Sequence, residues 1–180
     1  MALTDGIRRV VTTHDKDGKS VVKVDSVITQ YAHEPLAASG VRQFVFWVTD
    51  DTPAKPTEED TGARIVKIPP PPRGTIFRMV DFPPEHPGVA NLPNDHMAKI
   101  LGDVHHDGGH PSRHPFMHTT LTIDYIIVMS GEIDMLLDDG EVHLKAGDVL
   151  IQQSTNHSWV NRGTEVCRLC VILIDAVKPA

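Results

Sequence analysis

The residues with the clearest potential for chemistry lie along one segment with the composition of a β-strand, residues 118–128. Side chains alternate along a strand, so His118, Thr120, Thr122 and Asp124 share one face. Threonine favours strands for structural reasons alone, so the two threonines need no further explanation. An imidazole and a carboxylate on a face that should line a barrel interior are harder to explain by packing, and they indicate a site.

Short strands at even spacing must position these side chains. The sequence predicts strands over residues 119–129, 132–137, 141–145, 149–152, 157–161 and 168–174. Turn signals that contain glycine separate several of them. In the third of these strands, Val142 and Leu144 are expected to point inward. Strands of this length and spacing indicate a closed or two-sheet antiparallel barrel.

The first half of the chain is expected to be extended and rich in strands. Strands are predicted at 10–12, 21–24, 43–48, 63–68 and 74–82, and the first two flank a hairpin turn. Four prolines at 69–72 form a stiff connector, and residues 95–101 can form one or two helical turns. We therefore expect a single domain over residues 1–180, with an N-terminal arm and strands (1–82) packing on a barrel whose motifs lie within 114–176.

Composition argues against several classes of function. The chain has 180 residues, a formal net charge of −7 and no cluster of Lys or Arg, so no nucleic-acid partner is expected. Its apolar runs are too short to cross a bilayer, and its first six residues lack the basic start and apolar core of a signal peptide. Cys167 and Cys170 point to opposite faces of a predicted strand, which favours free thiols. We expect a cytoplasmic protein with no membrane partner.

Two groups of residues resemble the motifs of the cupin superfamily. The first group has the spacing of the first cupin motif and consists of His118, Asp124 and Gly131. The second group is similar to the second motif and consists of Gly147, Asp148, His157 and Asn161. The resemblance implies an all-β fold, a cupin-type antiparallel β-barrel (double-stranded β-helix or jelly roll) with an extended N-terminal strand-rich arm and one or two short helices. It implies no particular reaction, because this barrel hosts many unrelated activities.

The chain departs from the family pattern at two ligand positions. Thr120 stands where the first motif has a second histidine, and Asp124 stands where it has a glutamate. A proline and a glycine of the second motif are also missing, with Gln153 and Thr155 nearby. The chain therefore resembles a divergent branch of the superfamily.

The resemblance also implies that His157 faces the same cavity as His118. Two imidazoles and one carboxylate form the ligand set of non-haem iron, and the set also suits manganese, nickel or zinc. We therefore expect one divalent metal ion held by His118, Asp124 and His157, with His114 as a candidate fourth ligand and no organic cofactor. Two alternatives stay open: metal-free acid–base catalysis by His118 or His157 oriented by Asp124, and a satisfied polar cluster without chemistry.

Four residues are candidates for contacts with a substrate: Thr120, Thr122, Trp159 and Arg113. Arg113 lies near the expected cavity mouth, where a guanidinium would match a carboxylate, although an ordinary surface arginine is the competing interpretation. Trp159 either lines the cavity or fills the core. The other arginines considered carry no signal that distinguishes them: Arg42, Arg78 and Arg162. The histidine-rich loop at 103–115 is a weaker metal candidate, or a lid over the cavity.

The leading hypothesis is a small-molecule enzyme with one divalent metal, an oxygenase, isomerase, decarboxylase or lyase acting on a small polar or aromatic metabolite. The first alternative is a metal-free cupin cyclase, dehydratase or isomerase that uses histidine as the acid or base. The second is a ligand-binding cupin without turnover. A homodimer is expected, as for many cupins of this size, because it would cover exposed strand edges.

Overall fold

The computed structural model describes residues 6–29, 39–94, 96–101 and 112–177, and every strand pair within them is antiparallel. The larger sheet has the strand order β3 (Arg42–Thr49), β4 (Thr75–Phe82), β10 (Cys167–Asp175), β5 (Thr122–Ser130) and β8 (Val149–Gln153). The smaller sheet has the order β7 (Glu141–Lys145), β6 (Glu132–Leu137) and β9 (His157–Val160). The predicted all-β fold with antiparallel sheets is confirmed.

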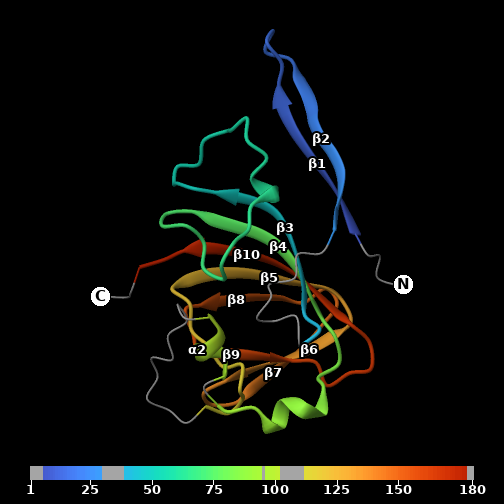
Figure 1. The fold of residues 1–180 in the computed structure, drawn as a ribbon, viewed down its shortest axis with the longest axis vertical. Helices are drawn as coiled ribbons and strands as arrows, with labels where there is room; N and C mark the ends of the chain where they lie inside the picture. The colour runs from blue at the N-terminus through green and yellow to red at the C-terminus, as the bar shows by residue number, and fades with distance from the viewer. Residues whose placement is uncertain (1–5, 30–38, 95, 102–111, 178–180) are drawn as a thin grey trace.

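The remaining elements are a hairpin and three short helical segments. The hairpin of β1 (Gly6–His14) and β2 (Ser20–Thr29) extends away from the two sheets (Figure 1). The helical segments are η1 (Thr61–Ala63), η2 (Pro87–Asn91) and α2 (His96–Leu101). The last two belong to the connection between β4 and β5, which runs from the larger sheet past the smaller one (Figure 1). No helix of the described residues has the length and apolar character needed to span a membrane.

The hydrophobic core lies between the two sheets. It joins side chains from both, including Ile76 of β4, Ile126 of β5, Ile133 of β6 and Leu169 of β10. On β5 these inward residues alternate with exposed ones, as the pleat of a strand requires. Burial of such side chains contributes roughly 1.5–3 kcal/mol each, so the core holds the sheets together.

The predicted strand at 63–68 is wrong. The segment begins with the last residue of η1 and forms no strand, and Ile65 is 81% exposed. The reason lies at the edge of β3, where the Val48 N–H donates to the hydroxyl of Thr61 at 3.0 Å. Arg64 meanwhile forms ion pairs with acidic residues of the same loop. Side-chain hydrogen bonds and ion pairs therefore fix this segment next to β3, in place of the backbone hydrogen bonds of a paired strand.

Val142 was predicted to point inward, but it is not buried as an inward residue of a covered strand would be. Its side chain is exposed, whereas Leu144 is buried as expected. β7 is an edge strand of the smaller sheet and, among the described strands, pairs only with β6. The part of β7 that contains Val142 is consequently left in contact with solvent.

The strand expected at 119–129 begins only at Thr122, because the chain bends near Leu121. Before the bend, His118 pairs with His157 in an isolated antiparallel bridge. After the bend, β5 pairs with β10 and β8 in the larger sheet. The bend therefore transfers the chain from the smaller sheet to the larger one, next to the site.

Gly131 makes the turn between β5 and β6 and has a left-handed backbone with φ of 75°. A Cβ atom at this position would lie 2.9 Å from the carbonyl oxygen of Val166 and 3.0 Å from the Cα of Cys167. Glycine alone meets both conditions without strain, which explains its place in the motif.

Candidate functional site

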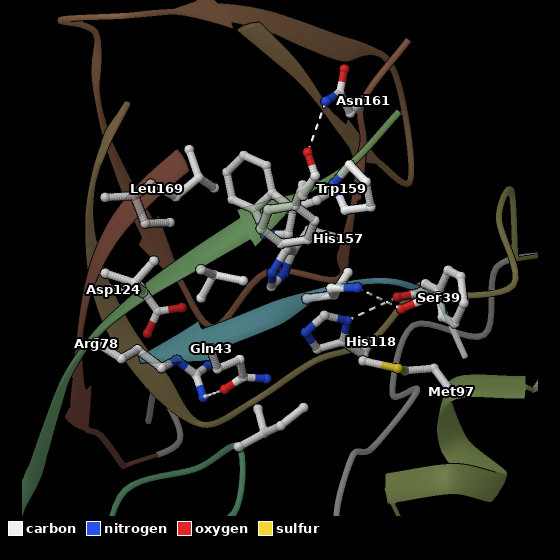
Figure 2. A pocket seen from close by; sticks show the side chains of 18 of the residues that line it. Ser39, Gln43, Arg78, Met97, His118, Asp124, His157, Trp159, Asn161 and Leu169 are labelled. Atoms are coloured by element: carbon white, nitrogen blue, oxygen red, sulfur yellow. Dashed lines mark hydrogen bonds between the residues drawn. The ribbon is translucent and has the colours of Figure 1, made fainter. Parts of the chain in front are cut away.

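A cavity of about 130 Å³ opens between the two sheets and is largely apolar. Hydrophobic side chains of β4, β5 and β10 form its walls: Val80, Phe82, Ile126, Leu169, Val171 and Leu173. The polar groups that face into it include Gln43, Arg78, His118, Asp124 and His157 (Figure 2). Thr120 lines it as well. A few convergent polar groups in an apolar cavity are typical of a small-molecule site.

His118 and His157 are held side by side by their own backbones. Each donates its backbone N–H to the carbonyl oxygen of the other, and both distances are 2.9 Å. The two imidazole rings consequently lie close together, with centroids 4.5 Å apart (Figure 2). The predicted proximity of the two imidazoles is therefore present in the structure.

Hydrogen bonds at Nδ1 orient both rings. Nδ1 of His118 lies 2.9 Å from the carbonyl oxygen of Phe116, which can only accept, so this Nδ1 donates and Nε2 of His118 keeps a free lone pair. Nδ1 of His157 lies 2.9 Å from the carbonyl oxygen of Thr155 and 3.0 Å from the amide nitrogen of Gln152, so it faces both an acceptor and a donor. Burial lowers the pKa of His118, and burial together with the neighbouring His118 lowers that of His157 to about 3. Both rings are therefore neutral near pH 7.

Asp124 contributes a buried carboxyl from β5. Its side chain is 4% exposed, and Oδ1 has no hydrogen-bond partner among the described residues. Burial raises the pKa of Asp124 to about 6, although the Thr122 hydroxyl and the charge of Arg78 act in the opposite direction. A carboxyl with such a pKa exchanges protons readily near neutrality.

Arg78 is a site residue that the sequence analysis did not distinguish. It is 7% exposed and donates from Nη1 to Oε1 of Gln43 at 3.1 Å. Figure 2 shows its guanidinium beside the carboxyl of Asp124. Burial lowers the pKa of Arg78 to about 10, so it stays charged at pH 7. The available signal was its position among the inward residues of β4, which are otherwise apolar: Ile76, Val80 and Phe82.

The structure does not group the three predicted metal ligands, although two of them, His118 and His157, lie side by side. Among the described residues, no three His, Cys, Asp or Glu side chains group so that they could hold a metal ion. Thr120 supplies a hydroxyl in place of an imidazole, and this hydroxyl lies 2.8 Å from that of Thr122. Asp124 lies near Arg78, whose positive charge also acts on His118. The cavity therefore already contains a cation close to the imidazoles.

The other predicted site residues are divided between the cavity and its surroundings. Thr120 and Trp159 line the cavity, and the Trp159 ring packs edge-on against that of His157. Thr122 is fully buried behind Thr120 and is not part of the wall. Arg113 lies away from the cavity, because it donates to the carbonyl oxygens of Leu137 and Gly140 in the β6–β7 turn.

His114, the candidate fourth ligand, does not line the cavity. Its Nε2 contacts Glu85 Oε1 at 2.8 Å, and its Nδ1 contacts the Ser158 hydroxyl at 2.9 Å. Glu85 does line the cavity, near its exposed side, so His114 positions a carboxylate that the sequence analysis did not single out. The remaining histidines of the loop fall in 102–111, outside the described residues.

Comparison with known proteins agrees with these features. The family model for the cupin domain matches residues 103–173. The chain is 31% identical to the Phomopsin biosynthesis cluster protein C' of Diaporthe leptostromiformis, covering 95% of this chain and 79% of that protein. It is 40% identical over 106 residues to the cupin-domain-containing oxidoreductase srdD of Neurospora crassa, covering 57% and 40% of the two chains. The Schizosaccharomyces pombe Cnp3 cupin domain aligns at 12% identity and a TM-score of 0.47, over 96% and 89% of the two chains. The chain therefore belongs to the cupin superfamily.

Proposed function

We propose that the protein is a small-molecule biosynthetic enzyme that catalyses proton transfer, with Asp124 as the proton acceptor. One observation carries the proposal: a buried carboxyl lines the cavity with an oxygen that no described residue satisfies. A buried polar atom without a partner is costly, and such groups concentrate at functional sites. A pKa of about 6 also suits a group that takes up and returns a proton at neutral pH.

The surrounding residues define the chemistry that the cavity supports. The carboxylate of Asp124 takes a proton from a carbon next to a substrate carbonyl; the electron pair of the C–H bond forms a carbon–carbon double bond, and the π pair of the carbonyl moves onto its oxygen. The proton then returns at another position, which isomerises the substrate without any oxidant. His118 offers a neutral Nε2 atom that accepts a hydrogen bond from a substrate hydroxyl or N–H. The apolar walls exclude water and so strengthen these interactions.

The names of relatives support a role in biosynthesis. Relatives that align along most of this chain are named as proteins of the phomopsin and oryzine biosynthesis clusters. Others are named as cupin-domain-containing oxidoreductases. These names describe those proteins, and they favour an enzyme over a binding protein for this one.

Solvent hydrogen exchange tests the proposal without knowledge of the natural substrate. The protein is incubated in D₂O with a panel of small aryl ketones and 1,3-dicarbonyl compounds, with a chelator present, and loss of C–H signals is followed by ¹H NMR. We expect catalysed exchange with at least one compound, abolished in Asp124→Asn and unchanged in Asp139→Asn, which alters an exposed carboxylate. Exchange that Asp124→Asn leaves intact contradicts the proposal.

A metal-dependent oxidoreductase is the second candidate, and the paired imidazoles favour it. Nδ1 of His118 donates to a backbone carbonyl, which is the arrangement that leaves Nε2 free for a metal. The metal would supply Lewis-acid or redox chemistry at His118 and His157. Elemental analysis of untagged protein distinguishes the candidates: about one equivalent of metal, lost in His157→Ala, favours the second over the first.

A further inference from the structure

The charge of Arg78 is poorly balanced compared with another buried charge on the same strand. Asp81 of β4 is 0% exposed, and both of its carboxylate oxygens receive hydrogen bonds from Arg168, with a further bond from Arg42. Arg78 lies three residues earlier, on the opposite face, and is also buried. Among the described residues it forms no ion pair, and its Nε has no hydrogen-bond partner. A buried charge without a counter-ion is costly, so its retention calls for an explanation.

The charge of Asp124 acts to raise the pKa of Arg78, but the two side chains form no direct ion pair. Both groups line the cavity, and Oδ1 of Asp124 is unsatisfied as well. Gln43 uses its amide oxygen to hold Nη1 of the guanidinium; Nε is itself fully buried, and Nη2 forms no hydrogen bond with the described residues. A hydrogen-bond donor at Arg78 and an acceptor at Asp124 are therefore both available to one bound molecule.

The cavity limits what such a molecule can be. Its volume of about 130 Å³ is close to that of an engineered cavity of about 150 Å³ that admits benzene. Apart from the polar groups described above, its walls are built mainly from hydrophobic side chains. An occupant is therefore about the size of one ring, mostly apolar, with one strong acceptor directed at the guanidinium.

We infer that Arg78, positioned by Gln43, binds an anionic oxygen of the substrate, and that the substrates are small organic anions with an apolar ring, such as aromatic carboxylates or enolates. This inference rests on the proposed function only in treating the cavity as the substrate site. A guanidinium matches the geometry of two acceptor oxygens, so a carboxylate is held in one orientation. The same contact stabilises the negative charge that develops on oxygen when a neighbouring carbon loses a proton.

Calorimetric titration with benzoate and benzamide tests the inference directly. The two probes have similar shapes, and only benzoate carries the charge. We expect benzoate to bind more tightly than benzamide, and Arg78→Met to weaken benzoate about 10- to 100-fold with little effect on benzamide. Arg8→Met serves as the matched control, because Arg8 is exposed on the hairpin and its one ion-pair partner among the described residues is Asp25. It should leave both affinities unchanged.

Thermal unfolding separates recognition from a structural role. A methionine in place of an uncompensated buried charge should keep or raise the Tm, whereas an Arg78 that supports the fold would give a lower Tm in Arg78→Met. Benzoate binding that survives in Arg78→Met, or absent benzoate binding in the wild-type protein, overturns the inference. Because binding is measured without turnover, Asp124→Asn protein that binds benzoate but shows unchanged hydrogen exchange would refute the proposed function alone.

Discussion

Replacing Asp124 by asparagine should stabilise the protein at pH 8 and leave its stability unchanged near pH 4. The carboxyl is buried, and its pKa rises from 3.8 in the unfolded chain to about 6 in the folded protein. The folded state therefore holds its proton more tightly than the unfolded state. A group with a raised folded pKa contributes stability that is complete below pH 3.8 and is lost as the pH rises through about 6.

The expected change in unfolding free energy follows from the shift in the pKa of Asp124. Roughly two pKa units correspond to about 3 kcal/mol at 1.36 kcal/mol per unit. Asparagine is neutral at every pH, so Asp124→Asn should recover about 3 kcal/mol of unfolding free energy at pH 8. The comparison with wild-type protein cancels the contributions of other titrating groups, His157 included.

Urea unfolding of both proteins at pH 4 and pH 8 measures the difference. Asp139→Asn, which changes an exposed carboxylate in the β6–β7 turn, should give no change at either pH. A lower unfolding free energy for Asp124→Asn at pH 8 would refute the argument, because it would mean that the ionised carboxylate is stabilised inside the cavity.

Three further predictions concern other parts of the molecule. His157 has a folded pKa lowered to about 3, so its contribution to stability is complete above pH 6.5 and is lost as the pH falls towards 3; His157→Gln should flatten this acid limb in urea titrations. Gly131→Ala should lower the unfolding free energy by about 1–3 kcal/mol, since the left-handed backbone and the contact with Val166 both oppose a Cβ, and an unchanged Tm would contradict this. The expected homodimer should give a light-scattering mass of two chains, and Ile151→Lys on the exposed outer face of β8 should shift it towards one chain; a wild-type mass of one chain would count against the dimer.

The last third of the chain was predictable because its signals are local. Residues 132–137 were predicted as a strand and form β6, since alternating apolar residues lie between two glycine turns. The segment at 63–68 also has apolar residues suited to a strand, yet its outcome depends on the hydroxyl of the neighbouring Thr61, which accepts from Val48 in β3. A single contact of this kind produces no periodic pattern of residues that could be recognised in the sequence.

The site was predictable where it lay within one segment. His118 and Asp124 both line the cavity, although the bend near Leu121 breaks the uniform alternation assumed between them. Arg78 was missed because its role depends on the sheet order, which places β4 beside β10 and so directs its inner face at the cavity. Arg113 was assigned to the mouth from sequence proximity alone, and its contacts with the β6–β7 turn place it elsewhere.

The opposite charges on the two faces of β4 also disfavour pairing of that strand in a shifted register. A slip of one residue would exchange the faces, which would move Asp81 among the apolar walls and Arg78 to the outer side. Asp81 would then lose the two arginines that neutralise it, at a cost of several kcal/mol. Folding intermediates in which β4 pairs in a shifted register are therefore destabilised by Arg78 and Asp81. Mutations that remove both charges should make shifted registers of β4 more favourable.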